Sequence, residues 1–311
     1  MTVDQPDETQ WHAGFACLVG RPNAGKSTLT NALVGDKVAI TSSKPQTTRH
    51  AIRGIVTREH QQLILVDTPG LHRPRTLLGE RLNDLVRETL LEVDVIGFCL
   101  PADQKVGPGD AYIAKDLAEL QRAKRVPVVA IATKSDKVDR ERLAEHLIAI
   151  DQLGDWAAII PCSAVRGDQV EELFGVLVEH LPTSPAALYP EGQLSDEDDD
   201  KMIAELVREA ALEGVRDELP HSLAVVVEEI VPREGRPEDD PMLDVRVNVF
   251  VERDSQKAII IGRGGSRLRE VGTTARVGIE KLLGTKVFLD LHVKVAKDWQ
   301  RDPKQLQRLG F

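Results

Sequence analysis

The sequence lacks a long hydrophobic run. It has 311 residues, of which 41% are hydrophobic, and no stretch approaches the roughly 20 uncharged apolar residues that span a bilayer as a helix. The first ten residues, MTVDQPDETQ, are acidic and contain no apolar segment of the kind found in a signal peptide. We therefore expect a globular, cytoplasmic protein, and we expect residues 1–12 to form a disordered tail.

Cysteine is scarce, with only Cys17, Cys99 and Cys162 in the chain. They are odd in number and far apart, and each belongs to an apolar, strand-like run, which argues against a disulfide framework. The eight histidines are scattered without the paired spacing of a zinc site. The three cysteines are therefore interpreted as small, buried core residues.

Basic residues are in the minority, and the formal net charge of −10 argues against a nucleic-acid partner for the chain as a whole. The charge is unevenly distributed, however. Residues 246–311 hold 14 Lys and Arg against 7 Asp and Glu, a net charge of +7, whereas the remaining residues hold 26 against 43. This asymmetry allows an anionic partner at the C-terminal part of the chain.

Short apolar runs alternate with amphipathic stretches over residues 13–182. GFACLVG, QQLILVDTPG, VDVIGFCLP, VPVVAIATK and AAIIPCSA are typical of buried strands, and helical patterns separate them at residues 77–92, 111–124 and 139–153. Such alternation predicts an α/β domain with a doubly wound, mostly parallel sheet that has helices on both faces.

The alternation stops at the segment LPTSPAALYPEGQLSDEDDD. Its prolines and its acidic run predict a linker over residues 183–198, and its last acidic residues suit the start of a helix. Residues 199–311 then follow the order helix–strand–strand–helix–helix–strand, which predicts an α+β domain.

A glycine-rich turn, GRPNAGKST, connects the first predicted strand to a helix. Its pattern GxxxxGK[ST] is that of a phosphate loop, in which backbone N–H groups and a helix N-terminus surround a phosphate. The lysine would contact the β- and γ-phosphates, and the serine hydroxyl would ligate Mg²⁺. The candidate nucleotide-binding residues are Gly20, Asn23, Ala24, Gly25, Lys26, Ser27 and Thr28.

About forty residues after the phosphate loop, the segment DTPG directly follows the strand LILV. Asp67, at the strand end, can hold Mg²⁺ through water. Gly70 can direct a backbone N–H toward the γ-phosphate and would lose that contact on hydrolysis. Alone, DTPG is an ordinary turn signal; after a phosphate loop it predicts a nucleotide switch.

Two further motifs predict that the base is guanine. In TKSD, the carboxylate of Asp136 can accept hydrogen bonds from the ring N–H and the amine of guanine, which adenine cannot donate. Lys134 would lie along the base, and Thr133 begins the motif. In CSA, Ser163 and Ala164 follow a strand and can supply a backbone N–H to the guanine carbonyl.

The C-terminal domain contains IIIGRGGSRLREVG. A GxxG turn between two helices allows the backbone to approach a nucleic-acid phosphodiester, as it does in KH modules, which clamp about four nucleotides. An ordinary helix–helix turn is the alternative, but the order of elements and the local positive charge favour a single-stranded RNA clamp. The candidate RNA-binding residues are Gly262, Arg263, Gly264, Gly265, Arg267 and Arg269.

The motifs GRPNAGKS, PQTTR, DTPGLH, TKSD and CSA occur in the order of the translation-factor-related GTPases, and together with the linker and the GxxG domain they most closely resemble the Era family. The resemblance implies a GTPase domain at residues 13–182 and a type II KH domain at residues 199–311. It also implies a switch that hydrolyses GTP to GDP with Mg²⁺, binds near the 3′ end of 16S ribosomal RNA and assists assembly of the small ribosomal subunit.

By the same resemblance, SKPQTTRH at residues 43–50 is the first switch, and either Thr47 or Thr48 completes the Mg²⁺ shell, with Thr48 preferred. Ser27 and Asp67 are its other ligand candidates. Lys26, Asn23, Thr48 and Gly70 are the candidate catalytic residues. Leu71 occupies the position at which Ras-like enzymes carry a water-orienting glutamine, so intrinsic turnover is expected to be slow. Related GTPases use a K⁺ ion held in part by the loop asparagine, here Asn23.

One departure and several alternatives accompany this interpretation. Thr133 stands where the family has asparagine, which puts nucleotide affinity in question. The basic C-terminal segment KDWQRDPKQLQRLGF is either a solvated helical tail or an RNA contact. A membrane-associated GTP-dependent signalling switch, peripheral at the inner face of the cell membrane, and a non-enzymatic RNA-binding module are the alternative functions. A monomer is expected.

Overall fold

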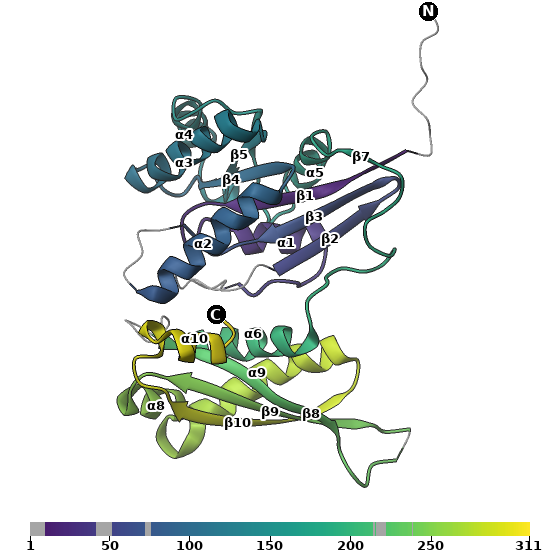
Figure 1. Ribbon diagram of the computed structural model, residues 1–311, viewed down its shortest axis with the longest axis vertical. Helices are drawn as coiled ribbons and strands as arrows, with labels where there is room; N and C mark the ends of the chain where they lie inside the picture. Colours follow the sequence, from purple (N-terminus) through teal and green to yellow (C-terminus); the bar gives the residue numbers. More distant parts are fainter. Residues whose placement is uncertain (1–9, 42–51, 72–75, 214, 216–221, 238) are drawn as a thin grey trace, which may run out of the picture. The chain divides into compact units, whose positions relative to one another are not determined.

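The computed structural model describes residues 10–41, 52–71, 76–213, 215, 222–237 and 239–311 (Figure 1). The chain forms two compact units. The first comprises residues 1–39, 48–73 and 82–196, and the second comprises residues 40–47, 74–81 and 197–311. Candidate switch residues 43–50, including Thr47 and Thr48, lie outside the described residues.

The first unit is built on a sheet with the strand order β2-β3-β1-β4-β5-β6, and a short strand β7 pairs with β1. β2 and β7 are antiparallel to their neighbours and the other pairings are parallel, so the prediction of a mostly parallel sheet is confirmed. The strands are β1 (Trp11–Val19), β2 (Ile52–Arg58), β3 (Gln61–Asp67), β4 (Val95–Pro101), β5 (Val128–Thr133), β6 (Ala158–Pro161) and β7 (Thr183–Ser184).

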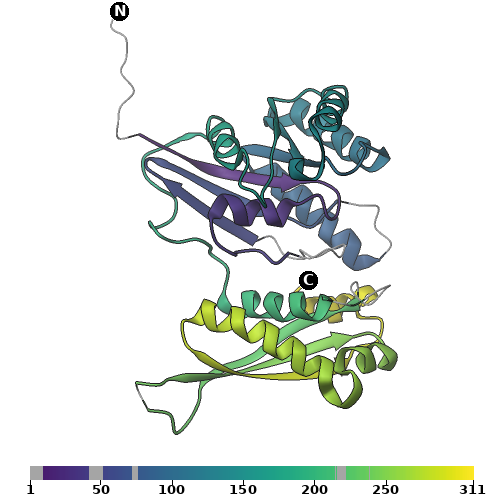
Figure 2. The same ribbon diagram turned by 180° about the vertical axis from the view of Figure 1, so that it is seen from behind.

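Helices cover both faces of this sheet (Figures 1 and 2). Side chains from α1 (Lys26–Val34) and α5 (Val170–Val178) pack into the core on one face. Those from α2 (Leu77–Glu92), α3 (Pro108–Lys124) and α4 (Arg140–Asp151) pack into the core on the other. The strands read as continuous apolar runs because both of their faces are buried.

The three cysteines lie in this unit and are buried and free of disulfides, as predicted. Burial raises the pKa of Cys17 and Cys99 to about 12 and that of Cys162 to about 11. Their thiols therefore stay protonated at neutral pH, which suits core residues and not nucleophiles.

The segment predicted as a linker is hydrogen-bonded to β3 and to the edge strand β2. Gln62 is fully buried, and its side-chain oxygen accepts from the backbone N–H groups of Leu188 at 2.7 Å and Tyr189 at 2.8 Å. Farther along, the backbone N–H of Ile55 in β2 donates to the carbonyl of Leu194 at 2.9 Å. The segment is thus fixed on the first unit up to the residues that precede the second.

The second unit contains a three-stranded sheet with the order β10-β9-β8, in which β9 and β10 are parallel and β8 is antiparallel. Its predicted order of elements is confirmed: α6 (Asp199–Leu212), β8 (Ala224–Pro232), β9 (Met242–Val251), α8 (Asp254–Ile261), α9 (Ser266–Leu283) and β10 (Lys286–Val295). The helices α6 and α9 cover one face of this sheet (Figure 1), and their apolar side chains form a core with it.

The C-terminal segment is not a solvated tail. It forms a short turn of 3₁₀ helix at Trp299–Arg301 and the helix α10 (Pro303–Arg308). Trp299 is fully buried, donates from Nε1 to the carbonyl of Ser222 at 3.0 Å and stacks on Phe311 with 5.5 Å between ring centroids. Of the two alternatives that the sequence left open, the solvated tail is excluded, because the buried tryptophan, and not the surrounding charges, determines how this segment packs.

Candidate functional site

The motifs of the first unit meet at the carboxyl edge of its sheet. The phosphate loop follows β1, DTPG follows β3, TKSD follows β5 and CSA follows β6. β3 and β4 lie on opposite sides of β1, so the connection after β1 leads to one side of that strand and the connection after β3 leads to the other. Open α/β sheets bind their ligands at such a switch point, beyond the carboxyl ends of the strands.

The phosphate loop has the strained backbone that its glycines predict. Gly20 and Gly25 have φ values of +154° and +92°, and Asn23 has a φ of +62°. Gly20 also needs to lack a side chain because an added Cβ would lie 2.6 Å from the carbonyl oxygen of Cys99. The loop is therefore held against β4 in a shape that directs its backbone N–H groups inward.

Lys26 begins α1 and is only 6% exposed. Its Nζ donates to the carbonyl oxygens of Gly20 at 3.4 Å and Arg21 at 3.3 Å. Burial lowers the pKa of the Lys26 ammonium, whereas the charge of Asp67 acts in the opposite direction. An ammonium that is removed from water beside a helix N-terminus is suited to a phosphate, which compensates its lost hydration.

Ser27 and Asp67 present oxygen atoms next to each other. The hydroxyl of Ser27 donates to Oδ2 of Asp67 at 2.7 Å, and Asp67 is fully buried. Mg²⁺ prefers a few protein oxygens and takes its other ligands from water and phosphate. A hydroxyl–carboxylate pair of this kind fits a Mg²⁺ ion that is held largely by a nucleotide.

The segment after Asp67 packs against the phosphate loop. A Cβ on Gly70 would lie 2.7 Å from the backbone nitrogen of Pro22, so only glycine allows this approach. The backbone N–H of Leu71 donates to the carbonyl of Gly20 at 3.3 Å, and the Leu71 side chain is buried in the core. Leu71 therefore offers no polar group with which to orient an attacking water.

The base motifs surround a cavity of about 220 Å³. Asp136 lines it, and its Oδ1 accepts from the Ser163 hydroxyl at 2.7 Å. Lys134 has a left-handed φ of +57° and its Nζ lies 3.3 Å from Oδ2 of Asp103. The other lining residues are Gly25, Thr28, Leu29, Thr133, Lys137, Cys162, Ala164 and Val165.

Thr133, at the end of β5, contacts the phosphate loop directly. Its hydroxyl donates to the carbonyl of Ala24 at 2.6 Å, and Thr133 is 4% exposed. The end of β5 is thereby tied to the phosphate loop through a short, buried hydrogen bond.

We expect Thr133→Val to weaken the binding of both GTP and GDP by about tenfold, because valine leaves the buried carbonyl of Ala24 without its donor. Isothermal titration with each nucleotide measures the effect. Thr133→Ser keeps the hydroxyl and is expected to retain most of the affinity. Unchanged affinity in the valine variant would show that this hydrogen bond does not support nucleotide binding.

Asp103, Lys137 and Val165 were not singled out from the sequence. Asp103 follows β4 and pairs with Lys134, while Lys137 and Val165 line the base cavity. The chain order gives no signal for the Asp103 contact, because residues 103 and 134 belong to different strand ends that only the parallel pairing of β4 and β5 brings together.

In the second unit, the GRGG sequence forms a tight turn between α8 and α9. Gly262, Gly264 and Gly265 have φ values of +70°, +57° and +75°. A Cβ at Gly262 would approach the Cβ of Arg267 to 2.8 Å, whereas one at Gly264 or Gly265 would meet nothing within 4 Å. The outer side of the turn is open to an approaching backbone, as the GxxG hypothesis requires.

The arginines predicted to bind RNA have different surroundings. Arg263 and Arg269 are exposed, and the described residues include no ion-pair partner for either. Arg267 is half-buried, and its Nη2 donates to the carbonyls of Ala211, at 3.2 Å, and Glu213 at the end of α6. Arg267 therefore caps α6 and ties it to α9, a structural role that the sequence pattern does not reveal.

A groove begins at the GRGG turn and runs between α9 and the edge strand β10. Its cavity measures about 340 Å³. At Gly272, in α9, an added Cβ would lie 3.5 Å from Cδ1 of Leu291, an ordinary van der Waals contact, so α9 and β10 approach each other closely there. The lining residues are Gly265, Leu268, Arg269, Gly272, Thr273, Arg276, Phe288, Leu289 and Leu291. Most of them were not predicted.

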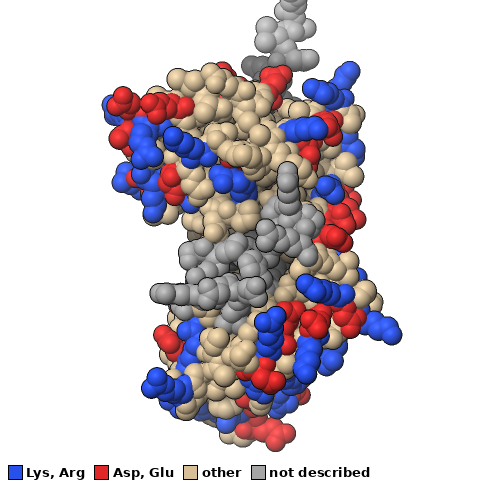
Figure 3. Space-filling view, turned by 90° about the vertical axis from the view of Figure 1, so that its left-hand side faces the viewer, with Lys and Arg blue, Asp and Glu red and all other residues tan. Residues whose placement is uncertain are grey.

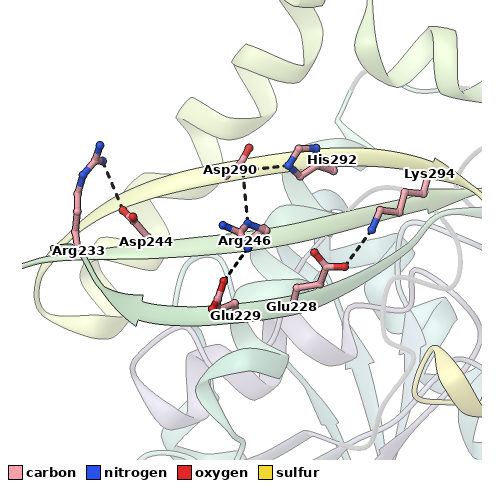
Figure 4. Close-up of polar contacts among 8 residues, drawn as sticks. All are labelled: Glu228, Glu229, Arg233, Asp244, Arg246, Asp290, His292 and Lys294. Atoms are coloured by element: carbon pink, nitrogen blue, oxygen red, sulfur yellow. Dashed lines mark hydrogen bonds and ion pairs between the residues drawn. The ribbon is translucent and has the colours of Figure 1, made fainter.

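The sheet face opposite the helices carries compensated charges (Figure 4). Arg246 contacts Glu229 at 2.8 Å and Asp290 at 3.8 Å, and Lys294 contacts Glu228 at 3.0 Å. Basic and acidic side chains are also interspersed over the part of this unit seen in Figure 3. Residues 199–311 hold 19 Lys and Arg against 21 Asp and Glu, so positive charge is available only locally, as at Arg263 and Arg269.

Comparison with known proteins finds relatives for both parts of the chain. Residues 15–134 match the family described as 50S ribosome-binding GTPase, and residues 218–300 match the KH domain family. The chain is 68% identical to GTPase Era of Streptomyces coelicolor, with 99% of this chain and 98% of that protein covered. It is 65% identical to GTPase Era of Mycolicibacterium paratuberculosis, with 97% and 100% covered.

Solved structures give the same result. A crystal structure of Era in complex with MgGDPNP and nucleotides 1506–1542 of 16S ribosomal RNA superimposes with a TM-score of 0.91 at 35% identity, covering 96% of this chain and 99% of that one. A variant of Aquifex aeolicus Era bound to GDP·AlF₄⁻ gives a TM-score of 0.90, also at 35% identity and with 96% and 99% covered.

The fold and the two sites define a phosphate-loop GTPase joined to a KH module. It hydrolyses GTP to GDP and uses Mg²⁺. The curated relatives are 65–68% identical to this chain over nearly its whole length, which narrows the assignment from this class to one family. The chain belongs to the Era family of GTPases.

Proposed function

We propose that this protein is a GTP-dependent switch that binds the 3′ end of 16S ribosomal RNA through its GRGG turn and groove, and so assists assembly of the small ribosomal subunit. The observation that carries the proposal is the combination, in one chain, of a guanine nucleotide site and an open GxxG groove with exposed arginines. The likeness to an Era structure that contains this RNA segment supports it.

We assign the roles in the GTPase site as follows. Lys26 and the loop N–H groups hold the phosphates, and Ser27 and Asp67, with Thr48, hold Mg²⁺, which supplies charge stabilisation when bound. Asp136, supported by the Ser163 hydroxyl, selects guanine. The N–H of Gly70 contacts the γ-phosphate and is released after hydrolysis.

We expect GTP hydrolysis to be slow, because Leu71 provides no polar group to orient the attacking water. We also expect it to be faster in K⁺ than in Na⁺, because a K⁺ ion held in part by Asn23 of the phosphate loop would compensate for that missing group. Steady-state phosphate release in matched chloride salts measures this. Asn23→Gly removes the amide but retains the left-handed φ of +62°, and it should abolish the difference between the salts. Equal rates in K⁺ and Na⁺ for the wild-type protein would refute K⁺ stimulation.

We propose that nucleotide and RNA binding are linked. The segment that leads into the second unit is hydrogen-bonded to β2, the strand that follows candidate switch residues 43–50. A change of the switch with nucleotide can thus alter the start of the RNA-binding unit. Linkage requires that if GTP raises the affinity for RNA, RNA raises the affinity for GTP by the same factor.

Titration of labelled RNA carrying nucleotides 1506–1542 tests the proposal directly, with GDP or a non-hydrolysable GTP analogue bound. Tight binding that is stronger with the GTP analogue supports the switch. Absence of binding in both states would overturn it. An RNA of equal length and scrambled sequence serves as the control, because electrostatic binding alone does not distinguish the two.

A membrane-associated GTP switch is the alternative function. No helix among the described residues is long and apolar enough to cross a bilayer. Sedimentation with anionic vesicles after nuclease treatment would distinguish a peripheral contact from RNA-mediated association.

We propose that the chain acts as a cytoplasmic monomer, with its GTPase domain at residues 13–182, a linker at 183–198 and the RNA-binding domain at 199–311.

A further inference from the structure

We propose that Asp110, acting through Arg21, is a positioning residue for GTP hydrolysis. The ion pair between these two side chains fixes the first half of the phosphate loop, residues 20–22, against the start of α3, and so sets the contacts that the loop makes with the γ-phosphate. This inference rests on the roles proposed above for Lys26 and Gly70, and it adds to them a residue outside the nucleotide-binding motifs.

Asp110 lies in the first turn of α3, which follows β4 and begins after Gly107. It is fully buried, and a buried carboxylate is costly unless its oxygens are hydrogen-bonded. Its Oδ2 accepts from the backbone N–H of Gly107 at 2.9 Å, and its Oδ1 accepts from Nε of Arg21 at 2.7 Å. The carboxylate is therefore held in place by the N-terminus of α3, whose dipole favours it, and offers its second oxygen to the phosphate loop.

The side chain of Arg21 lies against the first turn of α3. A Cβ added to Gly109 would lie 2.8 Å from Cδ of Arg21, so the glycine makes room for the arginine stem. The Arg21 side chain is 28% exposed, and the part of the chain that the structure describes holds no other carboxylate paired with it. Asp110 thus determines the direction in which this side chain leaves the loop.

The backbone of residues 20–22 in turn supports the groups that are proposed to meet the γ-phosphate. The two carbonyl oxygens that precede Pro22 accept from Nζ of Lys26 at 3.4 and 3.3 Å. Gly70 lies so close that an added Cβ would come within 2.7 Å of the Pro22 nitrogen. A shift of residues 20–22 would therefore displace both the lysine and the DTPG turn.

An ion pair suits this task because the loop backbone does not hold itself. Asn23 has a left-handed φ of +62°, a conformation that persists only where the surrounding structure imposes it. A charge-assisted hydrogen bond as short as that between Arg21 and Asp110 is stronger and more directional than a neutral one. The alternative is a purely structural role, in which Arg21 does no more than neutralise Asp110.

Breaking the pair is expected to affect GTP more than GDP, because Lys26 and Gly70 contact the γ-phosphate, which GDP lacks. Asp110→Asn leaves one oxygen in place of two, so the side chain cannot accept both of its hydrogen bonds. For this variant we expect the affinity for a non-hydrolysable GTP analogue to fall about tenfold and that for GDP to fall about threefold at most. Single-turnover hydrolysis at saturating GTP should slow by about tenfold.

The test uses the full-length protein and a double-mutant cycle. Arg21→Met keeps the aliphatic stem without the guanidinium, and Arg21→Met/Asp110→Asn should bind the GTP analogue no worse than Arg21→Met alone, because both substitutions break the same contact. Arg21→Lys retains a cation that can reach Asp110 and should recover most of the hydrolysis rate. Arg58→Met is the control, because Arg58 is 31% exposed and pairs with Glu171 at the opposite edge of the sheet.

Thermal unfolding of each GDP-bound variant reports on stability separately. Equal losses of affinity for the GTP analogue and GDP with an unchanged single-turnover rate, or effects that add in the double variant, would overturn the positioning role. If Arg21→Met does not fold, because Asp110 is left buried without its partner, Asp110→Asn decides by the same nucleotide and rate measurements. Lys26→Met tests the proposed roles themselves: if it binds the GTP analogue as tightly as wild type does, those roles fail, whatever the pair does.

Discussion

Asp136→Asn is expected to lower the affinity for GTP by about three orders of magnitude or more and to create a preference for xanthosine triphosphate. The carboxylate that accepts the ring N–H and amine of guanine becomes an amide, which accepts one hydrogen bond and donates another. Xanthine keeps the ring N–H and has a carbonyl in place of the amine, so it matches the amide. Competition of both nucleotides for a fluorescent analogue measures the exchange of preference.

The position of Asp136 makes this change local. Its Oδ1 accepts from the Ser163 hydroxyl, and a side-chain amide oxygen can accept the same bond. Asp103→Asn is a matched control, because it alters another carboxylate at the edge of the site that contacts Lys134 and not the candidate base position. We expect that control to keep its preference for guanine. An Asp136→Asn protein that still prefers GTP would show that another residue selects the base.

Gly264→Asp is expected to reduce RNA affinity by more than about a hundredfold and to leave GTP binding unchanged. The new side chain would occupy the open outer side of the GRGG turn, and its negative charge would repel the phosphate that the turn admits. Anisotropy titration with the labelled 16S segment measures the loss, and nucleotide titration of the same sample shows that the protein is folded.

Gly284→Asp provides a control with the same backbone requirement. Gly284 has a φ of +64°, close to the +57° of Gly264, and at both positions an added Cβ would meet nothing within 4 Å. It follows α9 and does not line the groove. Both substitutions therefore impose a similar conformational cost, and only Gly264→Asp should lose RNA. If both variants lost RNA affinity equally, backbone strain or the added negative charge would explain the loss, and the GRGG turn would not.

The sequence was sufficient for much of the fold because apolar periodicity and local motifs report local structure. The parallel strands with buried faces and the helix over residues 77–92 follow from such patterns. β2 was missed because AIRGIVTREH mixes polar and apolar residues, as an antiparallel edge strand does. The packed C-terminal segment was missed because its charges conceal the role of Trp299.

The candidate sites divide in the same way. The residues of the phosphate loop are close together in the sequence, and DTPG and TKSD each lie at the end of a predicted strand. Their positions in the site can therefore be predicted from the order of the strands along the chain. The groove cannot be predicted in this way: Thr273, Arg276 and Leu289 become neighbours only when α9 packs beside β10. Arg267 looked like an RNA contact because it follows the turn, but its guanidinium is used to cap α6.

Ultraviolet crosslinking of the protein to total cellular RNA, with GDP and with a non-hydrolysable GTP analogue, tests the central claim most directly. RNA recovered from the crosslinked protein is sequenced in both states. The account predicts enrichment of one single-stranded segment near the 3′ end of 16S ribosomal RNA in the GTP state, with loss of that signal in Gly264→Asp. Crosslinks that are the same with both nucleotides, or spread over unrelated RNAs, would contradict it.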